Sequence, residues 1–181
     1  MRHFRASNSL LNYNRWNTLM LMILMFFTAV SCGSTKNSED VEKMDQLRNL
    51  VESRQFEIQN EWAYPLSGGN INLIGNPNYI RFEGDSVNVF LPYFGVRHSG
   101  GGYGTEGGIK FKGVAEDLEV VKGQNENRLL LNFGGDQGNE DLNFTVTLYP
   151  NGKARTSVTS SQRQSINYQG EIRERTQSEK K

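Results

Sequence analysis

The stretch DLNFTVTLYPNGKARTSVT, residues 141–159, alternates apolar and polar side chains and has a turn signal at its centre. Every second position of its first half is large and apolar: Leu142, Phe144, Val146 and Leu148. Because successive side chains of a strand point to opposite faces, this pattern predicts a strand with one buried face. Pro150-Asn151-Gly152 then predicts a tight hairpin, since asparagine and glycine tolerate positive φ.

The same period of two recurs from Gln55 onward, interrupted by turns such as Glu83-Gly84-Asp85-Ser86 and the segment 123–127. Short turns between consecutive segments predict that sequential strands pair antiparallel. The expected fold class is mainly β, an antiparallel rolled sheet, barrel-like or sandwich, of about 8–10 strands. The candidate strands are 55–62, 71–74, 78–83, 86–91, 108–113, 117–122, 128–134, 141–149, 153–159 and 165–172.

One amphipathic helix is predicted ahead of the strands, over residues 39–54. Its apolar residues recur at helical spacing: Val41, Met44, Leu47, Leu50 and Val51. Asn37 or Ser38 can cap its N-terminus, and the acidic residues of the first turn suit the helix dipole. We expect this stripe to pack on the sheet of the same domain; the alternative is binding of a partner.

The N-terminal segment has the composition of a secretory leader. An uncharged apolar run over residues 19–30 follows a basic segment and precedes Cys32, the one cysteine of the chain. The run is shorter than the ~20 residues of a spanning helix and suits a signal-peptide core. Ala29-Val30-Ser31-Cys32 resembles the lipobox of bacterial lipoproteins, which implies acylation of Cys32 and attachment to a membrane. The alternative is an ordinary buried or free cysteine after a transmembrane start.

The expected organisation therefore has four parts. Residues 1–31 are a lipoprotein signal peptide, and residues 32–38, which are small and polar, are a flexible tether. Residues 39–172 are a single β domain with its N-terminal helix. Residues 173–181 lack apolar positions and are expected to be disordered.

Charge and cysteine content exclude several function classes. The chain has 20 basic and 20 acidic residues, and the three arginines before Cys32 leave 17 against 20 after cleavage. Nucleic-acid binding needs clustered lysine and arginine, so no nucleic-acid partner is expected. A single cysteine allows neither a disulfide framework nor a multi-cysteine metal site.

A glycine-rich connection raises the question of a cofactor. Residues 102–107, GYGTEG, match the glycine fingerprint for dinucleotide phosphates. That fingerprint needs a helix opening at its last glycine, because the helix N-terminus binds the phosphate. The alternating segment 109–112 predicts a strand there, so no cofactor is expected. The connection over 97–108 is then either functional or merely mobile.

Four residues around this connection are the candidate ligand-binding residues: Tyr93, Phe94, His98 and Tyr103. Aromatic residues at a strand end either plug the core or form a platform for a flat ligand such as a sugar ring. His98 is the one histidine after the leader, and no nucleophile-elbow sequence or zinc-ligand set accompanies it. No catalytic or metal-binding residue is therefore assigned. The oxygen-rich segment 136–141 departs from a calcium-loop spacing and is interpreted as a solvated hairpin turn.

Five short motifs follow one another along the chain: Tyr79-Ile80, Val89 with Leu91-Pro92-Tyr93-Phe94-Gly95, Gly108-Ile109-Lys110-Phe111, Asn151-Gly152-Lys153-Ala154 and Ile166-Asn167-Tyr168-Gln169-Gly170-Glu171-Ile172. In this order they resemble a lipoprotein family of Bacteroidetes, domain of unknown function 4251. The likeness covers roughly Val51 to Ile172. It implies an exported, usually lipidated, single-domain protein, with no catalytic residues to carry over. Asp85-Ser86-Val87 also resembles the O-glycosylation signal of exported proteins in these bacteria, which makes Ser86 a candidate site.

These observations favour a non-catalytic binding module of the cell envelope, anchored in the outer membrane through its lipid. Its partner would be a ligand or an envelope protein at the 92–108 end of the sheet, and carbohydrate, lipid and protein all stay open. Two alternatives remain, an envelope hydrolase and a structural or assembly component of an envelope complex. Whether the domain faces the periplasm or the cell surface is also left open.

Overall fold

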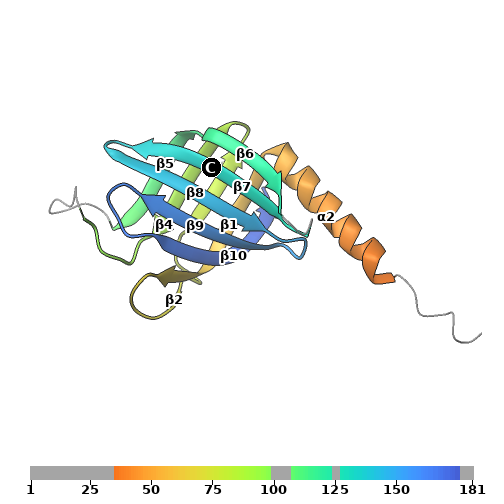
Figure 1. Cartoon of the computed structure of the whole chain (residues 1–181), viewed down its shortest axis with the longest axis horizontal. Coiled ribbons are helices and arrows are strands. Elements are labelled where there is room, and N and C mark those ends of the chain that lie inside the picture. Colours follow the sequence, from red (N-terminus) through yellow and green to blue (C-terminus); the bar gives the residue numbers. More distant parts are fainter. Residues whose placement is uncertain (1–34, 99–106, 124–126, 176–181) are drawn as a thin grey trace, which may run out of the picture. The chain divides into compact units, whose positions relative to one another are not determined.

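The computed structural model describes residues 35–98, 107–123 and 127–175. Contacts separate a unit that begins at Asp40 from one that ends at Glu39, and the β domain belongs to the former. The described residues form one helix and ten strands (Figure 1): α2 (Thr35–Ser53), β1 (Gln55–Pro65), β2 (Ile71–Asn72), β3 (Tyr79–Glu83), β4 (Ser86–Pro92), β5 (Gly108–Val114), β6 (Glu116–Lys122), β7 (Leu129–Gln137), β8 (Glu140–Leu148), β9 (Lys153–Ser160) and β10 (Ile166–Glu174).

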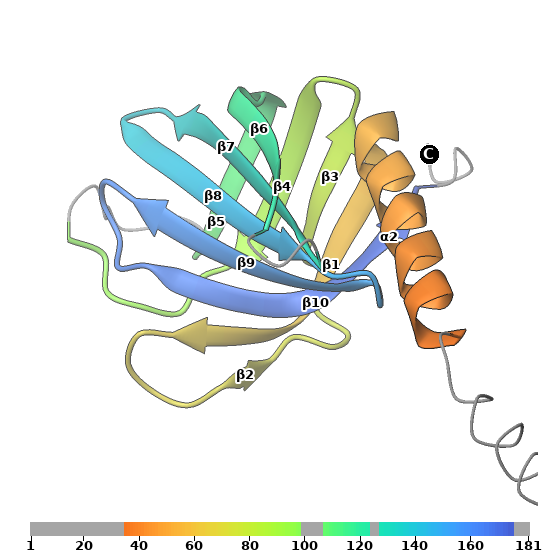
Figure 2. The same cartoon turned by 45° about the vertical axis from the view of Figure 1, so that its right-hand side comes forward.

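The strands form one antiparallel sheet in the order β5-β4-β3-β1-β10-β9-β8-β7-β6, and β2 pairs with β1. The sheet is rolled, with β7 to β10 on one side and β3 to β5 on the other (Figure 2). The predicted mainly β, barrel-like fold is therefore confirmed. All ten candidate segments are strands, and the hairpin at Pro150-Asn151-Gly152 has the expected positive φ of 80° at Gly152.

The expectation that all sequential strands pair is wrong at two places. β2 and β3 both pair with β1, and β5 and β6 are the two ends of the sheet. Only Ala115 connects β5 to β6, and Asp117 has a φ of 48°, so the chain crosses between the ends instead of folding back. The ring of Phe111 on β5 lies against Gly135 on β7, where an added Cβ would lie 2.5 Å from it. This contact nearly closes the barrel.

Aromatic rings fill the interior of the rolled sheet. Phe56 stacks on Phe82 with 4.6 Å between ring centroids, and Phe82 meets Phe133 edge-on at 5.3 Å. Phe133 in turn stacks on Phe144 at 4.6 Å. Because Phe82 lies on β3 and Phe133 on β7, their contact joins the two sides of the sheet. The interior is therefore a packed hydrophobic core.

Helix α2 contributes its last turns to this core. Met44, Leu47 and Val51 are buried, with 8%, 6% and 3% of each residue exposed, as the predicted stripe requires. Val41 was assigned to the same stripe but is 60% exposed. The helix also begins at Thr35, four residues before the predicted start, because neither glycine nor proline interrupts it. In the part of the chain that the structure describes, no helix is long and apolar enough to cross a membrane.

A bulge interrupts β1 near Asn60, where the backbone of β1 lies close to β10. The pairing of β1 with β10 shifts register between Asn60 and Trp62. The buried side chain of Asn78 takes the place of a strand partner there: its Oδ1 accepts from Asn60 N (2.7 Å) and its Nδ2 donates to the Asn60 carbonyl (2.9 Å). Gly170 of β10 lies opposite Asn60. The backbone of β1 passes so close to Gly170 that no side chain fits between the strands.

Candidate functional site

The start of the β4–β5 connection is held against the β9–β10 turn. His98 N donates to the Gln162 carbonyl (2.7 Å), and Gln164 N donates to the Val96 carbonyl (3.1 Å). These bonds form an isolated antiparallel bridge outside the named strands. The end of the sheet at which the sequence predicts ligand binding is therefore tied to a second loop.

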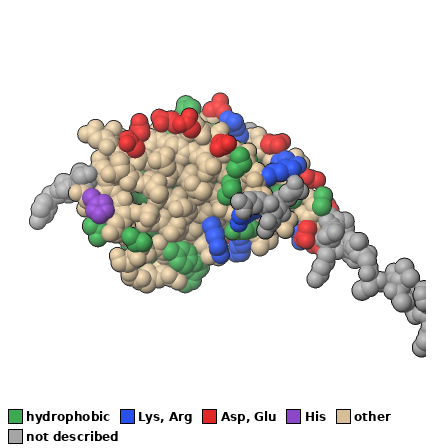
Figure 3. All heavy atoms as spheres, in the orientation of Figure 1, with side chains coloured by type: hydrophobic (Ala, Val, Ile, Leu, Met, Phe, Trp, Pro, Cys, Tyr) green, Lys and Arg blue, Asp and Glu red, His purple; other side chains and the backbone are tan. Residues whose placement is uncertain are grey.

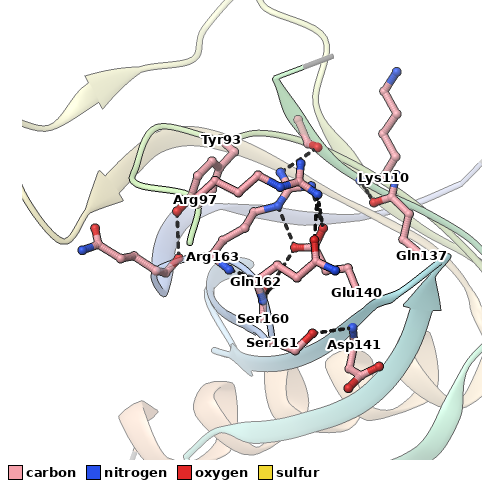
Figure 4. Close-up of polar contacts among 12 residues, drawn as sticks. Tyr93, Arg97, Lys110, Gln137, Glu140, Asp141, Ser160, Ser161, Gln162 and Arg163 are labelled. Carbon is pink, nitrogen blue, oxygen red and sulfur yellow. Dashed lines mark hydrogen bonds and ion pairs between the residues drawn. The ribbon is translucent and has the colours of Figure 1, made fainter. Parts of the chain in front are cut away.

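The two residues paired in this bridge, Arg97 and Arg163, both bind one buried carboxylate, that of Glu140 (Figure 4). Arg163 donates from Nε to Oε1 (2.6 Å) and from Nη2 to Oε2 (2.9 Å), which makes a bidentate pair. Arg97 donates to Oε2 (3.1 Å), and Ser160 donates to Oε1. We call these four residues the Glu140 cluster. The cluster joins the β4–β5 connection, the start of β8 and the β9–β10 turn.

The Glu140 carboxylate is held ionised. Burial acts to raise its pKa, but the hydrogen bonds from Arg163 and Ser160 and the charges of the two arginines outweigh burial. The pKa of Glu140 therefore lies below its ordinary value of 4.5. Since both oxygens already accept hydrogen bonds, this carboxylate is poorly suited to exchange protons with a substrate.

A second buried carboxylate, Glu57 on β1, has the same arrangement on the outer face of the sheet. Arg81 of β3 and Arg173 of β10 both bind it, and the side chain of Glu57 is only 3% exposed. Burial raises the pKa of Glu57, yet these two arginines bring it below its ordinary value. Glu57 and Glu140 are the buried carboxylates among the described residues, so neither offers the raised pKa typical of a general acid.

Tyr93 has an internal role. Its hydroxyl lies 2.8 Å from the Val96 carbonyl and 3.1 Å from the Gln164 carbonyl, and the Arg163 guanidinium lies 5.2 Å from its ring centroid. Burial raises the pKa of this hydroxyl. The sequence left two interpretations of Tyr93, packing against the core or forming a platform for a ligand. These contacts favour packing against the core.

The other residues selected from the sequence are distributed as follows. Phe94 is 36% exposed, and His98 is exposed and has its backbone N bonded to the β9–β10 turn. Tyr103 and Cys32 lie outside the described residues. Ser86 is exposed at the start of β4, so its O-glycosylation stays a prediction.

The segment 136–141 differs from its interpretation as a solvated turn. Asp136 and Asp141 are exposed and face each other across the β7–β8 hairpin, but Glu140 is buried in its cluster. Sequence reasoning missed the cluster because Arg163 lies in the polar segment SSQRQS, residues 160–165, which looks like an ordinary solvated turn. Within residues 35–98, 107–123 and 127–175, no group of three His, Cys, Asp or Glu side chains is arranged to hold a metal ion.

A groove of about 610 Å³ lies on the outer face of β1, β10, β9 and β8. Strand register arranges its side chains in two rows across the strands. One row runs Thr147, Arg155, Gln169, and the other runs Thr145, Ser157, Asn167, Tyr64. We call this surface the polar groove. Its lining residues are Tyr64, Thr145, Thr147, Arg155, Thr156, Ser157, Asn167, Tyr168 and Gln169.

The polar groove is rich in neutral hydrogen-bonding groups. Hydroxyl groups and carboxamides supply both donors and acceptors, and no carboxylate lines the groove. Tyr64 adds an aromatic ring and donates its hydroxyl to Gln169 Oε1 (3.2 Å). Figure 3 shows this side of the molecule, with few charged side chains at its centre and acidic side chains gathered along its upper edge.

Two other hollows have less suitable linings. One of about 560 Å³ over β3 to β5 contains Lys110, Lys112 and Asp136, and Lys110 Nζ lies 5.4 Å from the centroid of the Phe90 ring. Another of about 370 Å³ over β6 to β8 is bordered by acidic residues, including Glu116 and Asp117. Carboxylates line both of these hollows, whereas none lines the polar groove. The polar groove is therefore the candidate functional site.

Comparison with known proteins identifies relatives of this chain. The model of a protein family described as "Domain of unknown function (DUF4251)" matches residues 38–172. Among solved structures, the chain is similar to a DUF4251 family protein from Bacteroides eggerthii DSM 20697, with 14% identity and a TM-score of 0.57. The match covers 73% of this chain and 87% of that one. At this identity the likeness shows the fold alone. No curated protein matches the chain.

Proposed function

The chain belongs to the family described as domain of unknown function DUF4251, and from that premise we propose that it is a lipid-anchored envelope protein whose polar groove binds a carbohydrate without catalysis. The observation that carries the binding proposal is the lining of the groove. Sugars present hydroxyl groups at every edge and apolar C–H faces between them. Hydroxyl, carboxamide and aromatic side chains complement both surfaces.

A non-catalytic role agrees with the state of the buried carboxylates. Glycoside hydrolysis needs two carboxyl groups on either side of the bond that is cleaved. The polar groove has none, and arginines bind Glu57 and Glu140 elsewhere. These contacts favour a binding module over the alternative of an envelope hydrolase.

Filling the polar groove should abolish binding without unfolding the domain. Ser157 points outward from the middle of β9, between Thr145 and Asn167, so Ser157→Trp places an indole inside the groove. Full-length protein would be screened against a panel of plant, microbial and host polysaccharides. We expect wild type to bind at least one member and Ser157→Trp to lose at least about tenfold in affinity, or ~1.4 kcal/mol.

Thr159→Trp is the matched control, because Thr159 is exposed on the same strand and does not line the groove. This variant should keep wild-type affinity. Both variants should retain the wild-type melting temperature within a few degrees, since neither Ser157 nor Thr159 is buried in the core of the sheet. Absence of binding to every polysaccharide, or equal losses in the two variants, would reject the polar groove as a carbohydrate site.

The lipid anchor rests on the sequence around Cys32 and has its own test. Covalent acyl chains contribute about 0.8 kcal/mol per buried methylene, and two or more of them hold a protein stably on a bilayer. In a lipoprotein-processing bacterium, the wild-type chain should take up radiolabelled palmitate and sediment with membranes. Cys32→Ala should take up no label. Recovery of a wild-type chain that keeps residues 1–31 would contradict the proposal.

A further inference from the structure

Arg155 is an exposed cation of the polar groove and lies between Thr147 and Gln169 in one of its two rows. Seven of the nine arginines in the described residues have a carboxylate within 4.0 Å, and Arg155 is one of the two that do not. It also makes no hydrogen bond to another side chain of the described chain. The groove therefore has one positive charge that no carboxylate of residues 35–98, 107–123 and 127–175 balances.

Two carboxylates of β10 and β1, those of Glu171 and Glu61, already have a cationic partner. Glu171, two residues after Gln169 on β10, accepts a hydrogen bond from Lys153 Nζ (2.6 Å). Glu61 lies 3.9 Å from the same Nζ. Lys153 thus partly neutralises the negative charges of Glu171 and Glu61. The positive charge of Arg155 is therefore left to interact with a ligand in the groove.

Gln169 adds further donors beside Arg155. The two residues face each other across β9 and β10. Because Gln169 Oε1 accepts the Tyr64 hydroxyl (3.2 Å), the Nε2 amino group is the end of this side chain that is left for a ligand. A guanidinium and a carboxamide N–H group together form a site that lacks acceptors and suits a ligand oxygen with negative charge.

We propose that the polar groove binds an acidic oligosaccharide, with the carboxylate of one sugar residue held by Arg155 and Gln169. This inference rests on the proposed carbohydrate-binding function and adds the class of sugar. The planar guanidinium matches the two oxygens of a carboxylate. One unbalanced positive charge matches one carboxylate, whereas a phosphate monoester carries nearly two negative charges at neutral pH. The remaining hydroxyl and carboxamide groups bind the sugar hydroxyls.

The experiment compares acidic oligosaccharides with their carboxyl-reduced forms. Oligogalacturonate, oligoguluronate, hyaluronan fragments and sialylated oligosaccharides would be titrated into the full-length protein by calorimetry, each beside the same chain with its carboxylates reduced to alcohols. We expect at least one acidic ligand to bind and its reduced form to bind at least about tenfold more weakly. Arg155→Gln should lower affinity for the acidic ligand by roughly 10- to 100-fold, because a hydrogen bond to a charged group contributes about 1.5–3 kcal/mol.

Two further variants separate charge from geometry. Arg155→Lys keeps the charge but loses the bidentate fork, so its affinity should lie between those of wild type and Arg155→Gln. Lys122→Gln removes an exposed cation on β6 that does not line the groove, and its affinity should stay within about twofold of wild type, or ~0.4 kcal/mol.

The possible failures are distinguishable. If the reduced oligosaccharides bind as well as the acidic ones, or if Arg155→Gln binds like wild type, the carboxylate proposal is rejected and the carbohydrate function stands. If only sulfated sugars that lack a carboxylate bind, the carboxylate assignment is likewise rejected. If neither acidic nor neutral sugars bind, both proposals fail together.

Discussion

Replacing Gly170 with alanine is expected to unfold the domain or to lower its free energy of unfolding by about 3 kcal/mol or more. An added Cβ would lie 2.0 Å from the Gln59 carbonyl oxygen and 2.5 Å from Asn60 Cα. Both atoms belong to the backbone of β1, so no side-chain rotation can relieve the overlap. The two strands would have to separate at the centre of the sheet, where β1 and β10 join its two halves.

The measurement is chemical denaturation of the purified Gly170→Ala protein beside wild type and Gly69→Ala. Gly69 is exposed between β1 and β2, has no positive φ, and has no atom within 4 Å of the position that a Cβ would take. Gly69→Ala should therefore have nearly wild-type stability or gain a few tenths of a kcal/mol by restricting the unfolded chain. If Gly170→Ala unfolds at the same denaturant concentration as Gly69→Ala, the close approach of β1 to β10 is wrong.

The strands follow from the sequence because alternation is a local signal. Strands β7, β8 and β9 each bury one face, and the alternation of apolar and polar residues within each strand is enough to predict it. The role of Gly170 is not local. It depends on the bulge between Asn60 and Trp62, which lies more than a hundred positions away and shifts the register of β1. Nothing in the segment 166–172 distinguishes this glycine from one in an ordinary strand.

The crossing from β5 to β6 was not predicted, again because it depends on a contact between distant segments of the chain. Residues 108–113 and 117–122 both alternate, and a short connection between alternating segments usually indicates a hairpin. Closure of the sheet instead depends on Phe111 fitting against Gly135, a contact between strands that are not neighbours in sequence. Alternation in a single sequence therefore predicts the strands. Closure of the sheet depends on the packing of such distant pairs, which alternation does not reveal.

Local sequence patterns also could not predict the candidate site, the polar groove. Aromatic residues before a glycine-rich segment directed attention to Tyr93 and Phe94. The polar groove, in contrast, consists of threonine, serine, asparagine and glutamine on the outer faces of four strands. Such residues are expected on any solvent-exposed face, and only the strand register aligns them into rows. A polar strand face becomes a candidate only once its neighbours are known.

Replacing Arg163 with methionine is expected to lower the free energy of unfolding by about 3–5 kcal/mol, because removing one partner of a buried ion pair leaves the other charge buried. The side chains of Arg163 and Glu140 are 3% and 2% exposed. Arg163→Met removes the bidentate pair and the hydrogen bond to the Gly108 carbonyl. Glu140 keeps only Arg97 and Ser160 as partners. Chemical denaturation would measure the change.

Lys153→Met is the matched control for loss of a cation, since the Lys153–Glu171 pair is largely exposed. It should change stability little. The double variant Arg163→Met with Glu140→Gln should be more stable than Arg163→Met alone, because it leaves no carboxylate without its main partner. If the two substitutions instead add, the stability lost in Arg163→Met does not come from the ion pair.

The pH dependence of stability gives an independent measure of the Glu140 cluster. The folded-state pKa values of Glu140 and Glu57 lie below 4.5, so both carboxylates hold fewer protons than in the unfolded chain. Their contribution is therefore complete above pH 4.5 and is lost as the pH falls through their folded-state pKa values. The wild-type melting temperature should drop over this acidic range. Glu140→Gln should show a smaller drop, and a curve parallel to that of wild type would mean that the Glu140 carboxylate is not bound by its arginines in the folded protein.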